Sequence, residues 1–381
     1  MKRFKEQREL LVLDNNVVRF FFFLVMGLLS CTGAHGEITP VVLPGMRRNV
    51  SALYVLGDSS VDCGSNTLFY PQLHRNLSLI PCNGSNGNLL PHLLADKMGL
   101  PYTLSFYNQN GSVRDLLRGL NFGSAQATIM NPGSQGYQSL NQQLRQVFET
   151  IELLQLQLSP DRVIRFIRSS VFYLSFGKDD YINLFLSSSS SSGATPTYSS
   201  REFAHILVSE MVHVVRSLHD LKIRKIICQG ILPLGCTPRM TLESFDFAAG
   251  EDNGGGCWDR INSLVLEYNI MLEEKIIELN VEMPDAHVLF CDVYQGIKAI
   301  IANPERYGFE DVKSACCGLG LYGATIGCLS MEMACNNTAS HVWWDLYNPT
   351  RGVNSLLADS AWSGHPFSGL CRPMDIQDLL T

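Results

Sequence analysis

Four short apolar runs, spaced widely along the chain, constrain the fold more than any other feature of the sequence. Their hydrophobicity is nearly continuous rather than alternating, and each run ends in turn-forming or polar residues. This pattern is typical of strands that are buried on both faces of a parallel sheet. We expect these strands at residues 52–57, 171–177, 225–232 and 286–292.

Helical patterns lie between the apolar runs. Residues 202–218 and 258–279 each place their apolar side chains on one helical face, as expected for helices that pack on a core. Alternating strands and helices predict an α/β layered fold with crossover connections. The chain has 381 residues, of which 46% are hydrophobic, so it is long enough to bury a large core.

The N-terminus resembles a targeting segment. Basic residues in the first eight positions precede an apolar stretch at residues 17–29, which Arg19 interrupts. An uncleaved membrane anchor is the alternative interpretation. The uninterrupted apolar part, residues 20–30, is short for a membrane span, which needs roughly 20 residues. A cleaved secretory signal peptide is therefore the favoured interpretation.

Cleavage of this segment is expected after Gly36. Ala34 and Gly36 are small residues that suit signal peptidase, and Glu37 would then be the first mature residue. No convincing linker divides the remaining chain. We predict a signal peptide at residues 1–36, a single domain at residues 37–381, and no integral membrane span after cleavage.

The sequence also contains signals of an extracellular glycoprotein. Five Asn-x-Ser/Thr motifs are acceptor sites for N-glycosylation in a secreted chain. These sites are Asn49, Asn76, Asn83, Asn110 and Asn336.

The cysteines support the same compartment. Removal of Cys31 with the signal peptide leaves 12 − 1 = 11 cysteines, and an oxidising environment would pair many of them. Cys236 and Cys257 flank a Gly- and Asp-rich loop that a disulfide would close. An odd count leaves a free thiol, for which Cys291 in an apolar strand is the candidate. Local disulfides are expected among Cys316, Cys317, Cys328 and Cys335.

The charge pattern argues against a nucleic-acid partner. The formal net charge is −7, and the chain has no long run of Lys or Arg to form a basic surface. A metal site is not predicted either, because adjacent cysteines such as Cys316 and Cys317 do not have the spacing of a chelating pair. We expect a monomer.

A candidate nucleophile follows the first predicted strand. Ligands of open parallel sheets bind at the carboxyl ends of the strands. Gly57 permits a tight turn there, and Ser59 would start a helix whose N-terminus favours a nearby anion. This position suits a serine whose attack creates an oxyanion. A Ser or Asp helix cap is the structural alternative, and position alone favours the cap.

The residues around Ser59 resemble a known family. Residues 57–66, Gly-Asp-Ser-Ser-Val-Asp-Cys-Gly-Ser-Asn, are similar to the first signature block of the plant GDSL esterase/lipase family of SGNH hydrolases. The likeness extends in order over residues 51–363. Further matching segments are residues 119–122, 230–236, 316–318, 344–345 and 356–359.

This resemblance implies a three-layer α/β fold with a flavodoxin-like parallel sheet. It also implies secretion and hydrolysis of carboxylic esters by a serine nucleophile, without a cofactor. Ser59 matches the nucleophile of the family. Ala125 stands at the glycine whose backbone amide usually donates to the oxyanion, and this amide persists if Ala125 adopts the required dihedral angles.

The third family block departs from the usual Gly-x-Asn-Asp pattern. Residues 177–180 read Gly-Lys-Asp-Asp, so Asp179 replaces the asparagine that would donate to the oxyanion. An ionised carboxylate only accepts hydrogen bonds, whereas a protonated one can donate, and burial beside Asp180 would favour protonation. Loss of one oxyanion donor costs roughly 3–4 kcal/mol. Lys178 could neutralise Asp179, although we expect its side chain to face solvent.

The fourth block lies in residues 343–349, Trp-Trp-Asp-Leu-Tyr-Asn-Pro. The family pattern Asp-x-x-His-Pro aligns Asp345 with the acid and Asn348 with the catalytic histidine. An amide cannot take a proton from Ser59 at neutral pH, so the hydroxyl lacks its usual base. Asp345 is expected to hydrogen-bond the Asn348 amide instead.

Three other histidines are candidate substitutes for the missing base, and each is expected to be a surface residue rather than a base. His365 is the best placed in sequence, whereas His341 is expected to point elsewhere and His74 to lie in a loop. The sequence thus predicts a secreted esterase or lipase of weak turnover that acts on acyl or acetyl esters. The alternative is a catalytically impaired relative that binds a lipid or cell-wall polysaccharide ester in the inherited cleft.

Overall fold

The predicted apolar runs form the centre of one sheet. The computed structural model describes residues 50–62, 89–130, 138–186, 198–247 and 256–381. Its main sheet has the strand order β11-β6-β5-β4-β1-β3-β2, and every neighbouring pair is parallel except β11 with β6. The strands are β1 (Leu53–Gly57), β2 (Leu104–Ser105), β3 (Leu120–Asn121), β4 (Val171–Ser175), β5 (Lys225–Gln229), β6 (His287–Cys291) and β11 (Cys371–Arg372).

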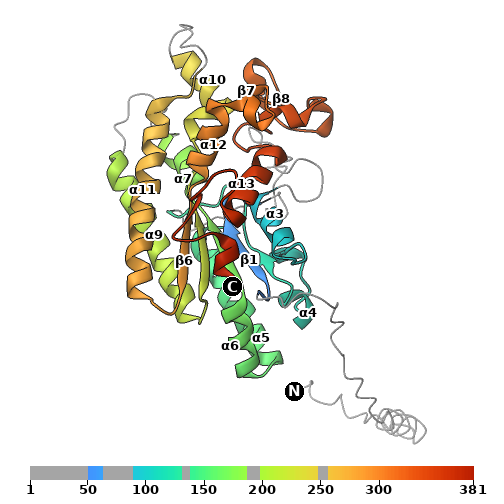
Figure 1. Cartoon of the computed structure of the whole chain (residues 1–381), viewed down its shortest axis with the longest axis vertical. Coiled ribbons are helices and arrows are strands. Elements are labelled where there is room, and N and C mark those ends of the chain that lie inside the picture. Colours follow the sequence, from blue (N-terminus) through green and yellow to red (C-terminus); the bar gives the residue numbers. More distant parts are fainter. Residues whose placement is uncertain (1–49, 63–88, 131–137, 187–197, 248–255) are drawn as a thin grey trace, which may run out of the picture. The chain divides into compact units, whose positions relative to one another are not determined.

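Helices cover both faces of this sheet (Figure 1). α5, α6, α9 and α11 contribute to one buried cluster, and α3, α12, α13 and α14 contribute to the other. The helices are α3 (Leu90–Lys97), α4 (Val113–Leu116), α5 (Leu140–Gln157), α6 (Pro160–Ser169), α7 (Lys178–Asp180), α9 (Ser200–Asp220), α10 (Pro238–Phe247), α11 (Asp259–Glu282), α12 (Val293–Ala302), α13 (Arg351–Ser363) and α14 (Ile376–Leu379).

Successive strand residues belong to opposite sides of the sheet. Tyr54 and Leu56 of β1 belong to the first cluster, whereas Leu53 and Val55 belong to the second. A strand between two helical layers must be apolar on both faces, which explains the continuous hydrophobicity of the sequence. The predicted α/β fold with a central parallel sheet is confirmed, and residues 48–381 form one compact unit.

The strand order creates a natural ligand site. β1 lies between β3 and β4, so the chain leaves β1 toward one edge of the sheet and later continues toward the other. Such reversal points are where flavodoxin-like sheets bind ligands, beyond the carboxyl ends of the strands. The segments that follow β1, β3 and β4 therefore meet at one place.

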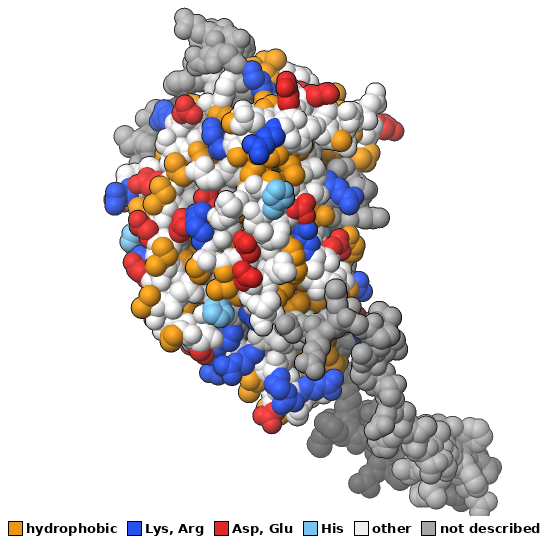
Figure 2. Space-filling model, in the orientation of Figure 1, with side chains coloured by type: hydrophobic (Ala, Val, Ile, Leu, Met, Phe, Trp, Pro, Cys, Tyr) orange, Lys and Arg blue, Asp and Glu red, His pale blue; other side chains and the backbone are white. Residues whose placement is uncertain are grey.

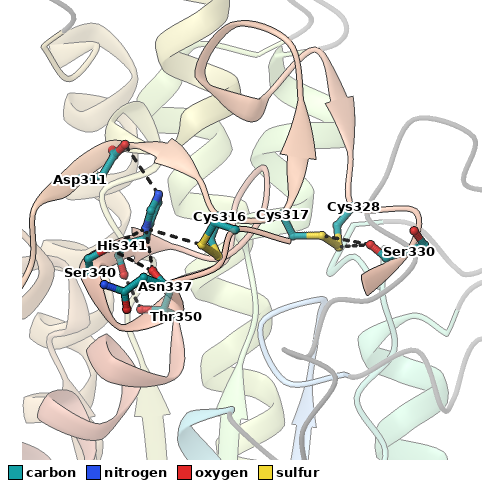
Figure 3. Close-up of a disulfide and its surroundings, with 10 residues drawn as sticks. Asp311, Cys316, Cys317, Cys328, Ser330, Asn337, Ser340, His341 and Thr350 are labelled. Atoms are coloured by element: carbon teal, nitrogen blue, oxygen red, sulfur yellow. Dashed lines mark hydrogen bonds and ion pairs between the residues drawn. A yellow bond between two sulfur atoms is a disulfide. The ribbon is translucent and has the colours of Figure 1, made fainter. Parts of the chain in front are cut away.

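A smaller disulfide-linked region follows α12. It contains β7 (Asp311–Ala315), β8 (Gly318–Leu319), β9 (Ile326–Gly327) and β10 (His341–Trp343). Two disulfides, Cys316–Cys335 and Cys317–Cys328, connect its short turns (Figure 3). The expectation of local disulfides in this region is confirmed, as is the bridge between Cys236 and Cys257.

The prediction that Cys291 is a free thiol is wrong. Cys291 forms a disulfide with Cys371, because β11 runs antiparallel to β6 and places the two residues opposite each other. The residues are 80 positions apart, so no local pattern could indicate the pair. Among the described cysteines, the free thiol is Cys228, which is buried on β5.

Some predictions concern residues outside the part of the chain that the structure describes. These are the predicted signal peptide, His74 and the predicted glycosylation sites Asn49, Asn76 and Asn83. Asn110 and Asn336 are described, and both are exposed. Within the described ranges, no helix is both long and apolar enough to span a bilayer. On the face in Figure 2, acidic and basic side chains are intermixed with apolar ones.

Candidate active site

Ser59 lies where the three strand ends meet. It follows β1 after a tight turn at Gly57, where an added Cβ would lie 2.5 Å from the Ser175 carbonyl oxygen. Glycine is therefore required for the close approach of this turn to the end of β4. The turn brings half-buried Ser59 to Asp179, which lies in α7 directly beyond β4.

Asp179 makes close contacts with both the side chain and the backbone of Ser59. The Ser59 hydroxyl donates to Oδ1 of Asp179 at 2.6 Å. The Ser59 amide donates to Oδ2 of the same carboxylate at 3.0 Å, and the Gln126 amide donates to Oδ2 at 2.8 Å. Oδ2 thus lies at a point shared by two backbone donors, with the separations found in an oxyanion site.

The backbone amide that faces this point belongs to Gln126 rather than to Ala125. The Ala125 amide donates to Oδ2 of buried Asp62 at 2.8 Å. Gln126 has a φ of 62°, a left-handed conformation that is uncommon for residues other than glycine. No sequence pattern indicated this conformation, because a glutamine is not expected at such a position.

Asp345 and Asn348 face each other across a tight turn. The backbone amides of Tyr347 and Asn348 donate to Oδ1 of Asp345 at 3.0 and 2.8 Å. The Asn348 side-chain amide donates to both carboxylate oxygens, at 3.1 and 3.0 Å. Asp345 is 1% exposed, and this burial raises its pKa above the usual range. The expected hydrogen bond between Asp345 and the Asn348 amide is therefore present.

The other side of Asn348 contacts Lys178. The Lys178 ammonium donates to Oδ1 of Asn348 at 2.7 Å. The Lys178 side chain is only 2% exposed, so the expectation that it faces solvent is wrong. Lysine is rarely buried without a partner, and here the amide oxygen supplies one. The sequence did not reveal this contact, because the two residues are 170 positions apart.

The two tryptophans of this segment are structural. Trp343 and Trp344 are 0% and 1% exposed, and the Trp343 ring nitrogen donates to the Val312 carbonyl at 2.9 Å. The Trp344 amide donates to the Asn348 carbonyl oxygen at 2.8 Å, which closes the turn. These contacts anchor the turn on which Asp345 and Asn348 lie.

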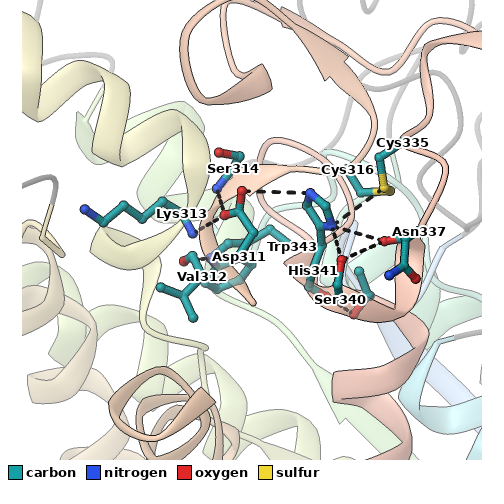
Figure 4. Close-up of polar contacts among 11 residues, drawn as sticks. Asp311, Val312, Lys313, Ser314, Cys316, Cys335, Asn337, Ser340, His341 and Trp343 are labelled. Atoms are coloured by element: carbon teal, nitrogen blue, oxygen red, sulfur yellow. Dashed lines mark hydrogen bonds and ion pairs between the residues drawn. A yellow bond between two sulfur atoms is a disulfide. The ribbon is translucent and has the colours of Figure 1, made fainter. Parts of the chain in front are cut away.

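The described histidines that the sequence offered as substitutes lie in other surroundings. His365 is exposed and follows the 13-residue helix α13, whose length of about 20 Å separates it from the turn at Asn348. The His341 ring contacts Asn337, Ser340 and Cys335 through Nδ1 and lies 3.8 Å from Asp311 through Nε2 (Figure 4).

Two further carboxylates hold the strand-end segments together. Asp180 accepts hydrogen bonds from the Ile129 and Met130 amides, which fixes the loop that contains Gln126. Asp58 accepts from the amides of Ser60 and Asp179. Burial raises the pKa of Asp180 to about 7, and burial together with the charge of Asp179 raises that of Asp58 to about 6.

A small cavity lies beside Asn348. Its volume is about 30 Å³, comparable with one water molecule. Ser60, Gln229, Pro349 and Asn354 line it together with six aliphatic side chains. The aliphatic residues are Leu89, Leu90, Leu232, Val293, Ile297 and Leu357.

One group of potential metal ligands lies outside this site. Cys316, Cys335 and His341 place their ligand atoms within 4.8 Å of one another. The two cysteines are joined in a disulfide, so they cannot supply the thiolates that zinc would need. This cluster thus fits a disulfide with a neighbouring histidine better than a metal centre.

Comparisons with known proteins identify the family of the domain. The sequence model of the GDSL-like Lipase/Acylhydrolase family matches residues 53–361, from β1 into α13. A GDSL esterase/lipase of Arabidopsis thaliana is 31% identical over 351 residues, covering 89% of this chain and 91% of the relative. GDSL esterase/lipase 7 of the same plant is 29% identical over 82% of this chain and 87% of its own length.

The match begins at β1, just before Ser59, and includes the turn of Asp345 and Asn348. The aligned residues also make up most of this chain and most of the first Arabidopsis relative, so the whole domain is shared rather than a single motif. The chain therefore belongs to the family of GDSL-like lipases and acylhydrolases.

Proposed function

We propose that this protein is a secreted hydrolase of carboxylic esters that uses Ser59 as its nucleophile and turns over weakly. The observation that carries the proposal is the contact between Ser59 and Asp179. The hydroxyl lies at the switch point of the sheet, half-buried, and is oriented by a hydrogen bond of 2.6 Å to a carboxylate. Acyl or acetyl esters of lipids or polysaccharides are the substrate class.

Weak turnover follows from the two residues that depart from the family pattern. Asn348 cannot accept a proton at neutral pH, and its amide is already engaged by Asp345 and Lys178. The Asp179 carboxylate lies where a substrate oxyanion would bind, so it must move before the two amides can serve the substrate. Hydrolases that lack a triad member retain roughly 10³–10⁴-fold acceleration over water.

Hydrolysis of p-nitrophenyl acetate and p-nitrophenyl butyrate by purified protein tests this proposal. We expect slow release of p-nitrophenol above the buffer rate, and loss of that release in Ser59→Ala. The Ser60→Ala variant is the matched control, because it removes a neighbouring hydroxyl and leaves the Ser59 hydroxyl that donates to Asp179. Equal rates for the wild type and Ser59→Ala would refute the proposed activity.

A binding protein without turnover is the second candidate. The chain of hydrogen bonds from Asp345 through Asn348 to Lys178 favours it, because this chain is complete without an imidazole. Under this alternative, an ester-bearing lipid or acetylated polysaccharide would bind equally well to the wild type and to Ser59→Ala. Neither protein would release product over hours.

Secretion is part of the proposal. It is supported by the leader-like N-terminal composition, by four disulfides among the described cysteines, and by the exposure of Asn110 and Asn336. Expression through the secretory pathway of a plant or insect cell tests it. We expect mature protein that begins at Glu37 and loses mass on treatment with a glycosidase that removes N-glycans. Retention of the leader in the cell membrane would contradict this part of the proposal.

A further inference from the structure

We propose that Asp179 is the catalytic base that accepts the Ser59 proton, in place of the imidazole that this chain lacks. The inference rests on the proposed function, since it concerns the same ester hydrolysis. Among the described residues, Asp179 is the side chain that hydrogen-bonds the Ser59 hydroxyl. The oxygen–oxygen separation of 2.6 Å lies within the reach required of a general base.

The Asp179 carboxylate is held in place from the backbone. Asp179 belongs to α7, and its amide donates to Oδ2 of Asp58 at 3.2 Å. The next residue, Asp180, is fixed by the amides of Ile129 and Met130. The Ser59 amide completes the arrangement by donating to Oδ2, so that Oδ1 points at the hydroxyl. The backbone of Asp179 is thus fixed, which keeps its carboxyl group within reach of the hydroxyl, and only the carboxyl group has to turn when a substrate enters.

The acylation step balances with these groups alone. The Ser59 proton passes to Oδ1 of Asp179 while Oγ forms a bond to the ester carbonyl carbon, and the carbonyl electron pair moves onto oxygen. Collapse of the tetrahedral intermediate breaks the bond to the alcohol, which takes the proton from Asp179. Deacylation repeats the sequence with water as the nucleophile, and the proton finally returns to Ser59.

Proton transfer to Asp179 also explains why two backbone amides, those of Ser59 and Gln126, surround its carboxyl group. In the resting site, the amides of Ser59 and Gln126 serve the negative charge on Asp179. Proton transfer neutralises that carboxylate as negative charge appears on the substrate oxygen, so the net charge of the site is unchanged. The carboxyl group must turn away from the amides to admit the substrate, which adds a free-energy cost to each turnover.

Labelling of Ser59 by a fluorophosphonate tests this role without requiring turnover. The reagent forms a bond between Oγ and phosphorus, releases fluoride, and depends on removal of the Ser59 proton. We expect Asp179→Asn to be labelled at least tenfold more slowly than the wild type, as measured by intact-mass spectrometry. Asp285→Asn is the matched control, because it removes one exposed carboxylate just before the amino end of β6, opposite the site.

A labelling rate of Asp179→Asn equal to or above that of the wild type would overturn the proposal. Asp179 would then be an anion that blocks the oxyanion position. If Asp179→Asn does not fold, as judged by its melting transition, the comparison is made between Asp179→Glu and Asp179→Gln. We expect faster labelling of the Glu variant, and equal rates would again overturn the role.

The two proposals fail in different ways. If labelling depends on Asp179 but no ester turnover depends on Ser59, the proposed function is refuted and the role of Asp179 as the base for Ser59 stands. If ester turnover depends on Ser59 but is undiminished in Asp179→Asn, the role of Asp179 as base is refuted and the proposed ester hydrolysis stands.

Discussion

The ammonium group of Lys178 donates a hydrogen bond of 2.7 Å to the side-chain oxygen of Asn348, in a part of the site where both residues are buried. The Asn348 amide nitrogen donates in turn to Asp345. A neutral amide thereby links a buried cation to a buried anion. Both ends of the Asn348 amide group therefore have a buried polar partner.

Removal of the Lys178 charge is expected to destabilise the fold. Lys178→Met keeps most of the apolar stem but removes the ammonium group that donates to the Asn348 side-chain oxygen. A buried acceptor that loses its donor costs about 1–3 kcal/mol. Urea unfolding should therefore show a lower free energy of unfolding by about that amount.

Lys97→Met is the matched control for this measurement. Lys97 pairs with Asp359 at the surface, where the two side chains are 27% and 51% exposed. Surface pairs contribute roughly 0–1 kcal/mol, so this variant should remain close to the wild type. An equal decrease in the free energy of unfolding of the two variants would show that the buried contact stabilises the fold no more than the surface pair does.

Introduction of an imidazole at position 348 is expected to raise activity. In Asn348→His, the ring can hydrogen-bond Asp345 and extend toward the adjoining cavity of about 30 Å³. A positioned base contributes typically 10²–10⁴-fold, and we expect about 10²-fold, because the Lys178 ammonium would disfavour protonation of the ring. The measurement is kcat/KM for p-nitrophenyl acetate.

Ser59→Ala in the Asn348→His background is the control, and it should abolish the gain. A gain that survives the loss of Ser59 would come from a different nucleophile. No gain in Asn348→His would mean that the imidazole does not reach Ser59 from this turn.

The parts of the fold that were predictable from sequence are those with a long local pattern. Apolar runs of five or more residues located β1, β4, β5 and β6 almost to the residue, and helical periodicity located α9 and α11. The strands β2, β3 and β11 have two residues each, too few for a period to emerge.

In the candidate site, too, only features with a local sequence pattern were predictable. Motif spacing predicted Ser59, Asp179, Asp345 and Asn348 as site residues, because each motif is contiguous, and the structure brings Ser59 into contact with Asp179 and Asp345 into contact with Asn348. Burial of Lys178 and the left-handed backbone of Gln126 depend on segments that meet only in the folded chain. A charged residue after a glycine gives no local sign that its side chain turns inward.

Asp180 is expected to make stability depend on pH. Burial raises its pKa from 3.8 to about 7, so the folded protein binds the proton more tightly than the unfolded chain. The stabilisation is fully present below about pH 4 and is lost as the pH rises through about 7. The melting temperature should accordingly be higher at pH 5 than at pH 7.

In Asp180→Asn, the difference between the melting temperatures at pH 5 and pH 7 should shrink. Asp285→Asn serves as the control, because hydrogen bonds from His219 and Arg224 lower the pKa of exposed Asp285 and move its titration below this window. A wild-type melting temperature that rises between pH 5 and pH 7 would contradict the sign of the prediction.

Cys228 is expected to be unreactive in the native protein. It lies on β5 with its side chain buried in the cluster to which α9 and α11 contribute, and burial raises its pKa to about 12. The thiolate, which is the reactive form, is thus almost absent at pH 8, and an alkylating reagent has no access to the buried sulfur.

Iodoacetamide should leave Cys228 unmodified in the folded protein and alkylate it in 6 M guanidinium without reductant. Peptide mapping by mass spectrometry measures both states, with the disulfide-linked Cys291 as an internal control that stays unmodified in each. Rapid alkylation of native Cys228 would mean that the layer of helices over β5 opens far more readily than its packing indicates.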